Sequence, residues 1–443
     1  MTRVRRLFAR NSTASPTRPS STGGDGPRAQ VDTAWVLDDG SLCIDGWLPT
    51  TPTESGDVYA RVVTSSAGVQ PAGRLFRKHR PDVAAHLLGG SGYQAGTADL
   101  GFVGHVPGHV TPGEPFSLEV SCDLGSAVTQ PLLVTSDAVP EEAFMGLAID
   151  PDTITPTSIA SLASVMRHSF PKPLPAATTA YAHSSLETVA SVNVVVPVYG
   201  GFTYLRNLLL ALAGAQTGAA ELTIVCDDPR IADELVTWAG RWNEAVYDAP
   251  VRVLVHDRNG GFAAACNSGW QASLSPLHLL LNSDVIVDSL AADLAHLSSL
   301  LVEGVAAVAP VLLFPDGSLQ HDGMILVEPD NLPGFTVPGH PGKGLAPAAW
   351  SGPFDAELLT GAAILTTTEV LQEVGGVPPV YGRGDFEDVL LSVAMSRLGR
   401  LVVDPDVRWT HVEGVSYDRD QHGGLPVTLA KSMVIAERLK ELS

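Results

Sequence analysis

The chain has 443 residues, 45% of them hydrophobic, which is enough for two or three globular domains. Its 48 acidic and 27 basic residues give a net charge of −21, which repels nucleic acid and anionic lipid and speaks against a DNA- or RNA-binding role. No apolar run approaches the ~20 residues of a membrane-spanning helix, and no apolar segment follows the basic N-terminus as in a secretory signal. We therefore expect a cytoplasmic protein, with peripheral association at the inner face of the membrane left open.

Composition separates a tail from a first domain. Residues 1–30 hold six arginines among many Ser, Thr, Pro and Gly residues, which predicts a disordered tail. Residues 31–136 contain short β-like runs separated by Gly, Pro and Asp, such as WVLDDGSLCIDGWL and FSLEVSCDL, and these predict a small antiparallel β-sandwich. No catalytic constellation stands out here, so we expect an accessory role in binding, docking or oligomerisation. A basic cluster at 74–80 either grips a phosphate or polysaccharide or lies in a solvated turn or an interdomain contact.

The cysteine pattern does not indicate a zinc site. The chain has four cysteines, widely spaced and without a CxxC pair: Cys43, Cys122, Cys226 and Cys266. Buried free thiols are therefore the expected state.

A linker at 137–190, rich in Pro, Thr, Ser and Ala, precedes the second domain at 191–443. In this domain short apolar runs alternate with helical segments, which predicts a doubly wound, mostly parallel α/β sheet. The runs that we interpret as its first strands are 192–197, 222–226, 251–255 and 277–281. Each ends in polar or Gly-rich residues, so the carboxyl edge of the sheet is the predicted site.

The remainder of the second domain predicts further elements in order. A helix is expected at 289–302, a hairpin around Pro315 to Gly317, and a long functional or mobile loop at 328–355. A strand follows within AELLTGAAILTTT, a helix begins at FEDVLL, and a strand is expected in LVVDPDVRWTH. An amphipathic helix containing Leu429 and Met433 ends the chain.

One loop at the predicted edge carries a carboxylate that could bind a metal ion. The apolar run 277–281 stops at Asn282-Ser283-Asp284, which places Asp284 at the carboxyl end of a strand. A carboxylate there can hold a hard cation, and the cation can hold a diphosphate. Taken alone, Asp284 could equally cap the next helix.

Seven motifs in order resemble one family. They are VVVPVYGG, IVCDD, DRNGGFAAACNSGW, LLLNSDV, LLTGAAILTTTEVLQEVGG, GDFEDVLL and THVEGVS, and together they span about 190 to 418. This set resembles the inverting family 2 glycosyltransferases of the GT-A fold. Within that family it is most similar to the bacterial rhamnosyltransferase-like branch, which builds surface polysaccharide and decorates glycoproteins.

The resemblance implies a divalent cation, Mn²⁺ or Mg²⁺, held by Asp284 and His411. Asn282 and Ser283 would orient this carboxylate or a bound water. The family often has Asp at the position of Asn282, so this departure lowers the local negative charge. His411 taken alone reads as a hydrogen-bonded core histidine.

The resemblance also assigns a nucleotide-sugar site. The acidic pair Asp227 and Asp228 would accept hydrogen bonds from the base and ribose, although such a pair can also cap a helix. The Gly-rich turn before the next helix can present free N–H groups to a phosphate or a sugar, although NGG alone is merely a turn. The other implied donor-binding residues are Pro197, Val198 and Tyr199 against the base, Arg258, Asn259 and Gly261 in the turn, and Asn267 on the helix.

For chemistry, inversion requires a base that removes the proton of the acceptor hydroxyl. Asp388 matches the position of the family's base, with Glu387 beside it, although acids at a helix start are common caps. Many relatives carry a second Asp where this chain has Leu390, and Asp385 is an alternative base. We therefore leave the choice among Asp385, Glu387 and Asp388 open.

The leading hypothesis is a metal-dependent, inverting hexosyltransferase of polysaccharide biosynthesis. It would move a sugar from dTDP-rhamnose or a UDP-hexose to a hydroxyl of a saccharide or glycoconjugate. One alternative is a non-catalytic carbohydrate-binding or scaffold protein with a decayed transferase domain, motivated by Asn282 and Leu390. A nucleotidyltransferase would need a basic Gly-rich loop near the first strand of the second domain, where the sequence offers only Arg206. The sequence does not specify donor, acceptor, linkage or oligomeric state, although the β domain could support an oligomer.

Overall fold

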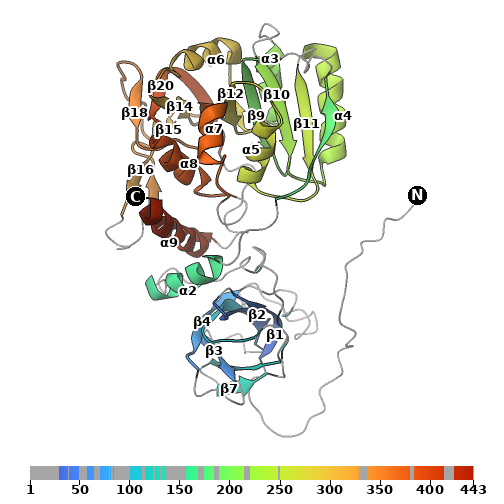
Figure 1. Cartoon of the computed structure of the whole chain (residues 1–443), viewed down its shortest axis with the longest axis vertical. Helices are drawn as coiled ribbons and strands as arrows, with labels where there is room; N and C mark the ends of the chain where they lie inside the picture. Colours follow the sequence, from blue (N-terminus) through green and yellow to red (C-terminus); the bar gives the residue numbers. More distant parts are fainter. Residues whose placement is uncertain are drawn as a thin grey trace, which may run out of the picture.

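A computed structural model shows two bodies joined by helices. It describes residues 29–37, 39–48, 57–63, 70–78, 100–111, 115–122, 125–129, 156–167, 174–183, 189–213, 220–247, 250–328, 337–379, 384–413 and 424–442, with single residues 80, 83, 132, 134 and 143. The predicted tail at 1–30 lies outside these residues except for its last two positions. In Figure 1 the small β domain lies below the large α/β domain, and two helices lie between them.

The small domain is an antiparallel sheet curled around its own core (Figure 1). Alternating side chains explain its strands: in VYARVV, Val58, Ala60 and Val62 are buried and the residues between them are not. This confirms the predicted all-β antiparallel domain. The strand order is β1-β2-β5-β4-β3-β6-β7. The strands are β1 (Gln30–Val36), β2 (Leu42–Trp47), β3 (Val58–Val63), β4 (Gly73–Lys78), β5 (Gly101–Val106), β6 (Ser117–Cys122) and β7 (Gly125–Val128).

The basic cluster of this domain is neutralised from within. Side-chain N···O distances are 2.8 Å for each of three ion pairs, which are Arg74–Asp57, Lys78–Asp45 and Arg80–Asp32. Lys78 is also buried and donates to a backbone carbonyl. The cluster therefore holds the domain and its neighbouring segment together, which disfavours the interpretation as a grip for phosphate.

The large domain contains the predicted parallel strands. Neighbouring strands β12, β9, β10 and β11 are all parallel, and β9 is almost entirely buried because helices cover both faces. Val194 and Val196 face α3, α4 and α6, whereas Val195 faces α5, so the sheet is doubly wound as predicted. The elements are β9 (Val192–Val198), α3 (Leu205–Ala213), β10 (Ala220–Cys226), α4 (Ala232–Trp242) with a π-helical turn at Asn243–Tyr247, β11 (Val251–His256), α5 (Phe262–Gln271), β12 (Leu277–Leu281) and α6 (Leu290–Ser299).

Antiparallel strands complete the sheet and make it mixed. The full order is β13-β20-β14-β19-β12-β9-β10-β11-β8, with only β14 and β20 adding another parallel pair among the described strands. The edge strand β8 (Ala177–Ala182) comes from the segment predicted as a linker. The further elements are β13 (Val285–Ile286), β14 (Val305–Leu313), β15 (Leu319–His321), β16 (Ile325–Val327), β17 (Val337–Gly339), β18 (Phe354–Ala356), β19 (Ala363–Thr367), α7 (Thr368–Val374), α8 (Glu387–Ser396) and β20 (Arg400–His411).

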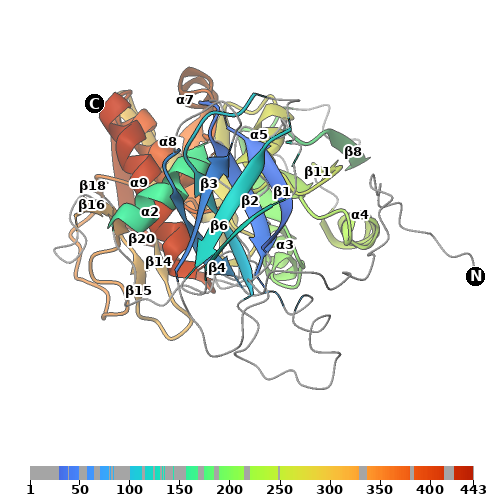
Figure 2. The same cartoon turned by 90° about the horizontal axis from the view of Figure 1, so that it is seen from below.

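Helices α2 (Pro156–Arg167) and α9 (Gly424–Leu442) connect the two bodies. Figure 2 shows α2 crossing α9 beside the strands of the β domain. One apolar cluster contains Trp35 and Phe76 of the β domain, Leu162 of α2 and Val434 of α9. Because these apolar side chains of the β domain, α2 and α9 are buried against one another, the cluster fixes α9 against the β domain.

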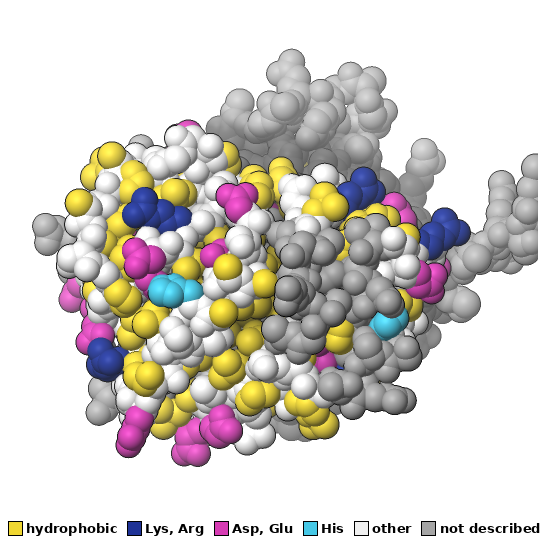
Figure 3. Space-filling model, turned by 90° about the horizontal axis from the view of Figure 1, so that it is seen from above, with side chains coloured by type: hydrophobic (Ala, Val, Ile, Leu, Met, Phe, Trp, Pro, Cys, Tyr) yellow, Lys and Arg dark blue, Asp and Glu magenta, His cyan; other side chains and the backbone are white. Residues whose placement is uncertain are grey.

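The described helices and the visible surface agree with the sequence, in which no apolar run approaches the length of a membrane-spanning helix. None of the described helices is long and apolar enough to cross a bilayer. On the face of the large domain away from the β domain, the visible charged side chains of both signs lie scattered among apolar ones (Figure 3).

All four cysteines are free, and three of them are buried, as the sequence predicts. Burial raises the pKa of the Cys43 and Cys266 thiols well above the ordinary value, which keeps them protonated.

Candidate active site

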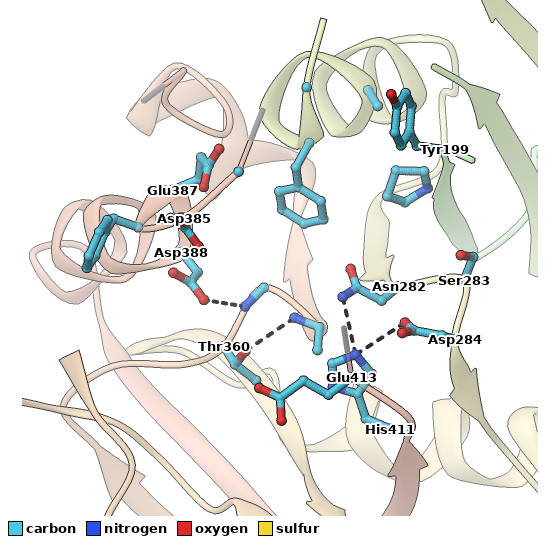
Figure 4. A pocket seen from close by; sticks show the side chains of 18 of the residues that line it. Tyr199, Asn282, Ser283, Asp284, Thr360, Asp385, Glu387, Asp388, His411 and Glu413 are labelled. Carbon is cyan, nitrogen blue, oxygen red and sulfur yellow. Dashed lines mark hydrogen bonds and ion pairs between the residues drawn. The ribbon is translucent and has the colours of Figure 1, made fainter. Parts of the chain in front are cut away.

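A pocket of about 790 Å³ opens at the carboxyl edge of the parallel strands. Its walls come from the loops after β9, β11 and β12, from the end of β20, and from a turn before α8. Figure 4 shows Tyr199, Asp284 and Asp388 on different sides of this hollow. The predicted residues that line it are Pro197, Val198, Tyr199, Asp227, Asn259, Gly261, Asn282, Ser283, Asp284, Glu387, Asp388 and His411.

Strand pairing brings together the two predicted metal ligands. Strand β13 runs antiparallel to β20, with Val285 opposite His411, and the N–H of Val412 donates to the carbonyl of Asp284. Consequently Nε2 of His411 lies 3.2 Å from Oδ1 of Asp284 (Figure 4). Both side chains are about 10% exposed, so they face the pocket from a mostly buried position.

Neighbouring amides fix the state of the His411 ring. Nδ1 of His411 lies 2.8 Å from Oε1 of Gln320, which can only accept, so Nδ1 carries the proton. In the neutral ring Nε2 then has a lone pair, and this nitrogen lies 3.5 Å from Nδ2 of Asn282 and 3.2 Å from Oδ1 of Asp284. This is the tautomer that a metal-binding histidine needs, with its second nitrogen held by an outer partner.

The donor set at this point fits a divalent cation. One carboxylate oxygen and one imidazole nitrogen leave most coordination positions for water and a ligand, as Mn²⁺ or Mg²⁺ at a nucleotide site requires. Within the described part of the chain, a group of three converging ligands occurs elsewhere, at His296, Asp404 and Asp406. Its side chains belong to α6 and β20 and do not line the pocket.

On the side of the pocket predicted to bind the nucleotide, Asp227 ties the Gly-rich turn to β10. Its carboxylate accepts from the N–H groups of Gly260 and Gly261, both at 2.8 Å, and lies 2.7 Å from Nδ1 of the buried His256. Gly261 has a φ of 84°, a conformation that favours glycine at the start of α5. The carboxylate of Asp227 is thus already used to shape the turn that lines the pocket.

Three predicted donor-binding residues do not line the pocket. Asp228 is buried and held by Arg230 at 2.7 and 2.8 Å. Arg258 donates to the carbonyl of Leu174 and pairs with its neighbour Asp257, outside the pocket. The amide of Asn267 is occupied on both sides by the backbone of Val377, at 2.7 and 2.8 Å, so it fastens α5 to the segment after α7. Their roles in donor binding therefore stay predictions.

The arginine beside Asp228 also changes that carboxyl group. Hydrogen bonds from Arg230 lower the pKa of Asp228, and Arg230 lies over the ring of Tyr199 at 5.6 Å. Arg230 thus contacts both Asp228 and Tyr199, and of these two residues only Tyr199 lines the pocket.

The third wall is an acidic turn at the start of α8. Oδ2 of Asp388 accepts from the N–H of Gly361 at 2.9 Å, and Oδ1 accepts from Val389 at 2.9 Å, so the carboxylate has a fixed direction. Burial raises the pKa of Asp388, and it raises the pKa of Glu387 well above the ordinary value. Asp385 shares this wall.

The structure adds residues that the sequence did not single out. Nζ of Lys343 lies 2.8 Å from Oε1 of Glu413. Because Glu413 follows His411 by two residues, this pair places a cation beside the predicted metal centre. His340 joins it from the same loop, and burial lowers the pKa of His340 to about 4, so its ring is neutral at pH 7. Both fall within the loop predicted at 328–355, whose length was the one signal for them.

Part of the chain matches a known family. Residues 193–314 match the family described as Glycosyl transferase family 2. A curated relative, "Uncharacterized protein y4gI" of Sinorhizobium fredii (strain NBRC 101917 / NGR234), is 28% identical over 224 residues. That match covers 48% of this chain and 23% of the relative, so the chain spans about a quarter of the length of the relative.

Solved structures show remote similarity, each at 16% identity. GalNAc-T7 with UDP, GalNAc and Mn²⁺ has a TM-score of 0.40, covering 51% of this chain and 44% of that one. Mannosyltransferase PcManGT from Pyrobaculum calidifontis in complex with GDP-Man and Mn²⁺ has a TM-score of 0.38, with 62% and 75% covered. S. aureus TarS 1-349 in complex with UDP has a TM-score of 0.35, with 50% and 60% covered. Residues 193–314, which run from β9 to just past the end of β14, thus match the Glycosyl transferase family 2 model and lie within the mixed α/β sheet.

Proposed function

We propose that this chain is a metal-dependent, inverting glycosyltransferase that moves a hexose from a nucleotide-diphosphate donor to a hydroxyl group. One observation carries the proposal: Asp284, His411 and Asp388, more than a hundred residues apart at the extremes, line a single pocket. We propose dTDP-rhamnose or a UDP-hexose as donor. The acceptor would be a surface polysaccharide or glycoconjugate, and the transfer would take place in the cytoplasm.

In this proposal Asp284 and His411 hold the cation, and the Tyr199 side of the pocket holds the nucleotide. When bound, the cation neutralises the diphosphate and stabilises it as a leaving group. An acidic protein needs this help, because the donor would otherwise bring two further negative charges to an already negative surface. Lys343 is placed to add a positive charge on the same side.

Asp388 is the proposed base. As the acceptor oxygen forms its bond to the anomeric carbon, the bond to the diphosphate breaks and the hydroxyl proton passes to the Asp388 carboxylate. Hydrogen bonds from Gly361 and Val389 aim the carboxylate, and burial raises its pKa and hence its basicity. Attack from the side opposite the leaving group inverts the anomeric centre.

Glu387 suits a different role. Its side chain is 4% exposed, and burial raises its pKa well above the ordinary value, which favours the protonated form. A protonated carboxyl cannot accept the hydroxyl proton. This favours Asp388 over Glu387 as the base, with Glu387 as a buried neighbour that shapes the turn.

The test is a panel of nucleotide sugars assayed for transfer and slow hydrolysis, with Mn²⁺, with Mg²⁺ and with EDTA. We expect metal-dependent turnover of one donor class, with the inverted anomer as product. Nucleotide binding without turnover of any donor in the panel would support the scaffold alternative. A product with retained configuration would contradict the proposed mechanism.

A further inference from the structure

The C-terminal helix α9 contributes to the pocket although it lies far beyond the segment that matches the family. Thr428 of α9 is among the residues that line the pocket. Lys431, one turn later, is 1% exposed. Its Nζ donates to the carbonyl of Gly384 at 2.9 Å and lies 3.4 Å from Oδ2 of Asp385. Burying an ammonium group is costly unless it is paired, so these contacts account for its position.

The turn that Lys431 grips has an unfavourable backbone conformation. Asp385 and Phe386 have φ values of 81° and 73°, in the left-handed region that non-glycine residues rarely adopt. Phe386 precedes the first residue of α8 and gives it no side-chain cap. Such a conformation persists only when surrounding contacts determine it, and α9 supplies contacts to both residues: Lys431 to Asp385, and Ile435 to Phe386.

The turn also concentrates negative charge. Asp385, Glu387 and Asp388 fall within four residues, and the buried Glu387 is close enough to Lys431 for the ammonium to oppose the rise in its pKa. Without a neighbouring cation, these carboxylates would repel one another, and the repulsion would favour a more open turn or the protonated carboxyl groups. The ammonium of Lys431 therefore offsets charge at the place where the backbone is strained.

We propose that Lys431 is a positioning residue that holds the turn 384–388 so that Asp388 faces the acceptor hydroxyl. This inference rests on the proposed function, because it presumes that Asp388 is the base. Lys431 does not contact substrate in this scheme. It acts through the backbone of Gly384 and the carboxylate of Asp385.

The same helix, α9, also connects the turn to the β domain. The face of α9 that carries Val434 packs against α2 and the β domain, whereas Lys431 and Ile435 contact the turn. Helix α9 thus transmits the position of the β domain to the acidic turn. The β domain supports the geometry of the turn without adding a catalytic group.

The test compares Lys431→Met with Arg400→Met in the full chain. Arg400 is an exposed residue of β20 that pairs with Asp355 at 2.9 Å, away from the pocket, so its loss controls for removal of a surface cation. We expect Lys431→Met to lower kcat about a hundredfold, since a base displaced by about 1 Å loses that much. Metal-dependent binding of the nucleoside diphosphate and KM for the donor should stay at wild-type values. Arg400→Met should leave all three unchanged.

Chemical rescue separates positioning from general damage. Lys431→Ala leaves room for ethylammonium, and added ethylammonium should restore at least about tenfold in kcat, whereas ethanol of similar size should not. This arm also applies if Lys431→Met fails to fold. An unchanged kcat in Lys431→Met, or a kcat in Lys431→Ala that ethylammonium does not raise, would overturn the inference. If the wild-type protein transfers no sugar at all, the proposed function has failed instead.

Discussion

Oε1 of Gln320 lies 2.8 Å from Nδ1 of His411, and Nε2 of the same ring lies 3.2 Å from Asp284. Gln320 therefore holds the ring in the tautomer that can bind a metal ion. We predict that Gln320→Leu weakens Mn²⁺ binding about 10- to 100-fold, as loss of an outer partner of a metal ligand typically does. Electron paramagnetic resonance titration of Mn²⁺ measures this, with the exposed Gln372→Leu as control. Equal Mn²⁺ affinity in both variants would show that the ring needs no such partner.

Asp284→Ala should weaken donor binding itself. Because this carboxylate is the proposed anionic ligand, its loss should cost more than the ~10- to 100-fold expected for Gln320. Calorimetric titration of UDP and dTDP with Mn²⁺ measures the affinity, and EDTA should reduce the wild-type protein to the level of the variant. Asp288→Ala, an exposed carboxylate four residues on, is the matched control. A donor affinity that changes neither with EDTA nor in Asp284→Ala would contradict a role for the metal in donor binding.

Asp388→Asn should abolish transfer and leave donor binding intact. Loss of a general base costs about 10² to 10⁴ in kcat, whereas Asn can still accept from Gly361. The control is Asp406→Asn, an exposed position on β20. An active Asp388→Asn enzyme would contradict Asp388 as the base and favour Asp385.

The pH dependence of wild-type turnover tests the same base. Only the deprotonated carboxylate accepts a proton, so kcat should fall as pH is lowered through the pKa of Asp388. Burial raises this pKa above the ordinary 3.8, which moves the acid limb to higher pH than for an exposed aspartate. A kcat profile that stays flat down to pH 4 would contradict the assignment.

Asp227→Ala should destabilise the fold as well as the donor site. The variant removes the acceptor of the Gly260 and Gly261 N–H groups and the partner of His256. Hydrogen bonds to a charged group contribute about 1.5 to 3 kcal/mol each, and neighbouring ones are not additive, so we expect a loss of about 3 kcal/mol. Urea unfolding measures it, with the exposed Asp233→Ala as control. A loss below about 1 kcal/mol would mean that the turn holds its shape without Asp227.

His278 should make stability depend on pH. Burial lowers its pKa to about 4 from 6.5, so the folded state disfavours the charged ring that the unfolded chain accepts. Stability due to the neutral ring is complete above pH 6.5 and is lost as pH falls towards 4, by about 3 kcal/mol. Unfolding of the wild type and of His278→Gln from pH 7 to 4 should show a smaller loss in the variant. The exposed His109→Gln is the control for removal of a histidine.

The sequence by itself determined the parallel half of the large domain and much of the pocket edge. Buried strands such as β9 are recognised from continuous valines, and polar residues that follow them, such as Asp284, must lie at the carboxyl edge. These inferences work because apolar periodicity and turn chemistry are local. The antiparallel β domain was predicted for the same reason.

Only the tertiary structure decided which local features meet. The linker strand β8 joins the sheet through pairing with β11, and Asn267 is withdrawn from the pocket because Val377, 110 residues away, occupies its amide. Lys343 lines the pocket from a long loop whose length was its one signal, and Lys431 contacts the turn beside the pocket from a helix whose local pattern carries no sign of it. Such contacts depend on the free energy of packing distant segments together, which no short stretch of sequence encodes, whereas the identity of the strands depends on neighbours a few residues apart.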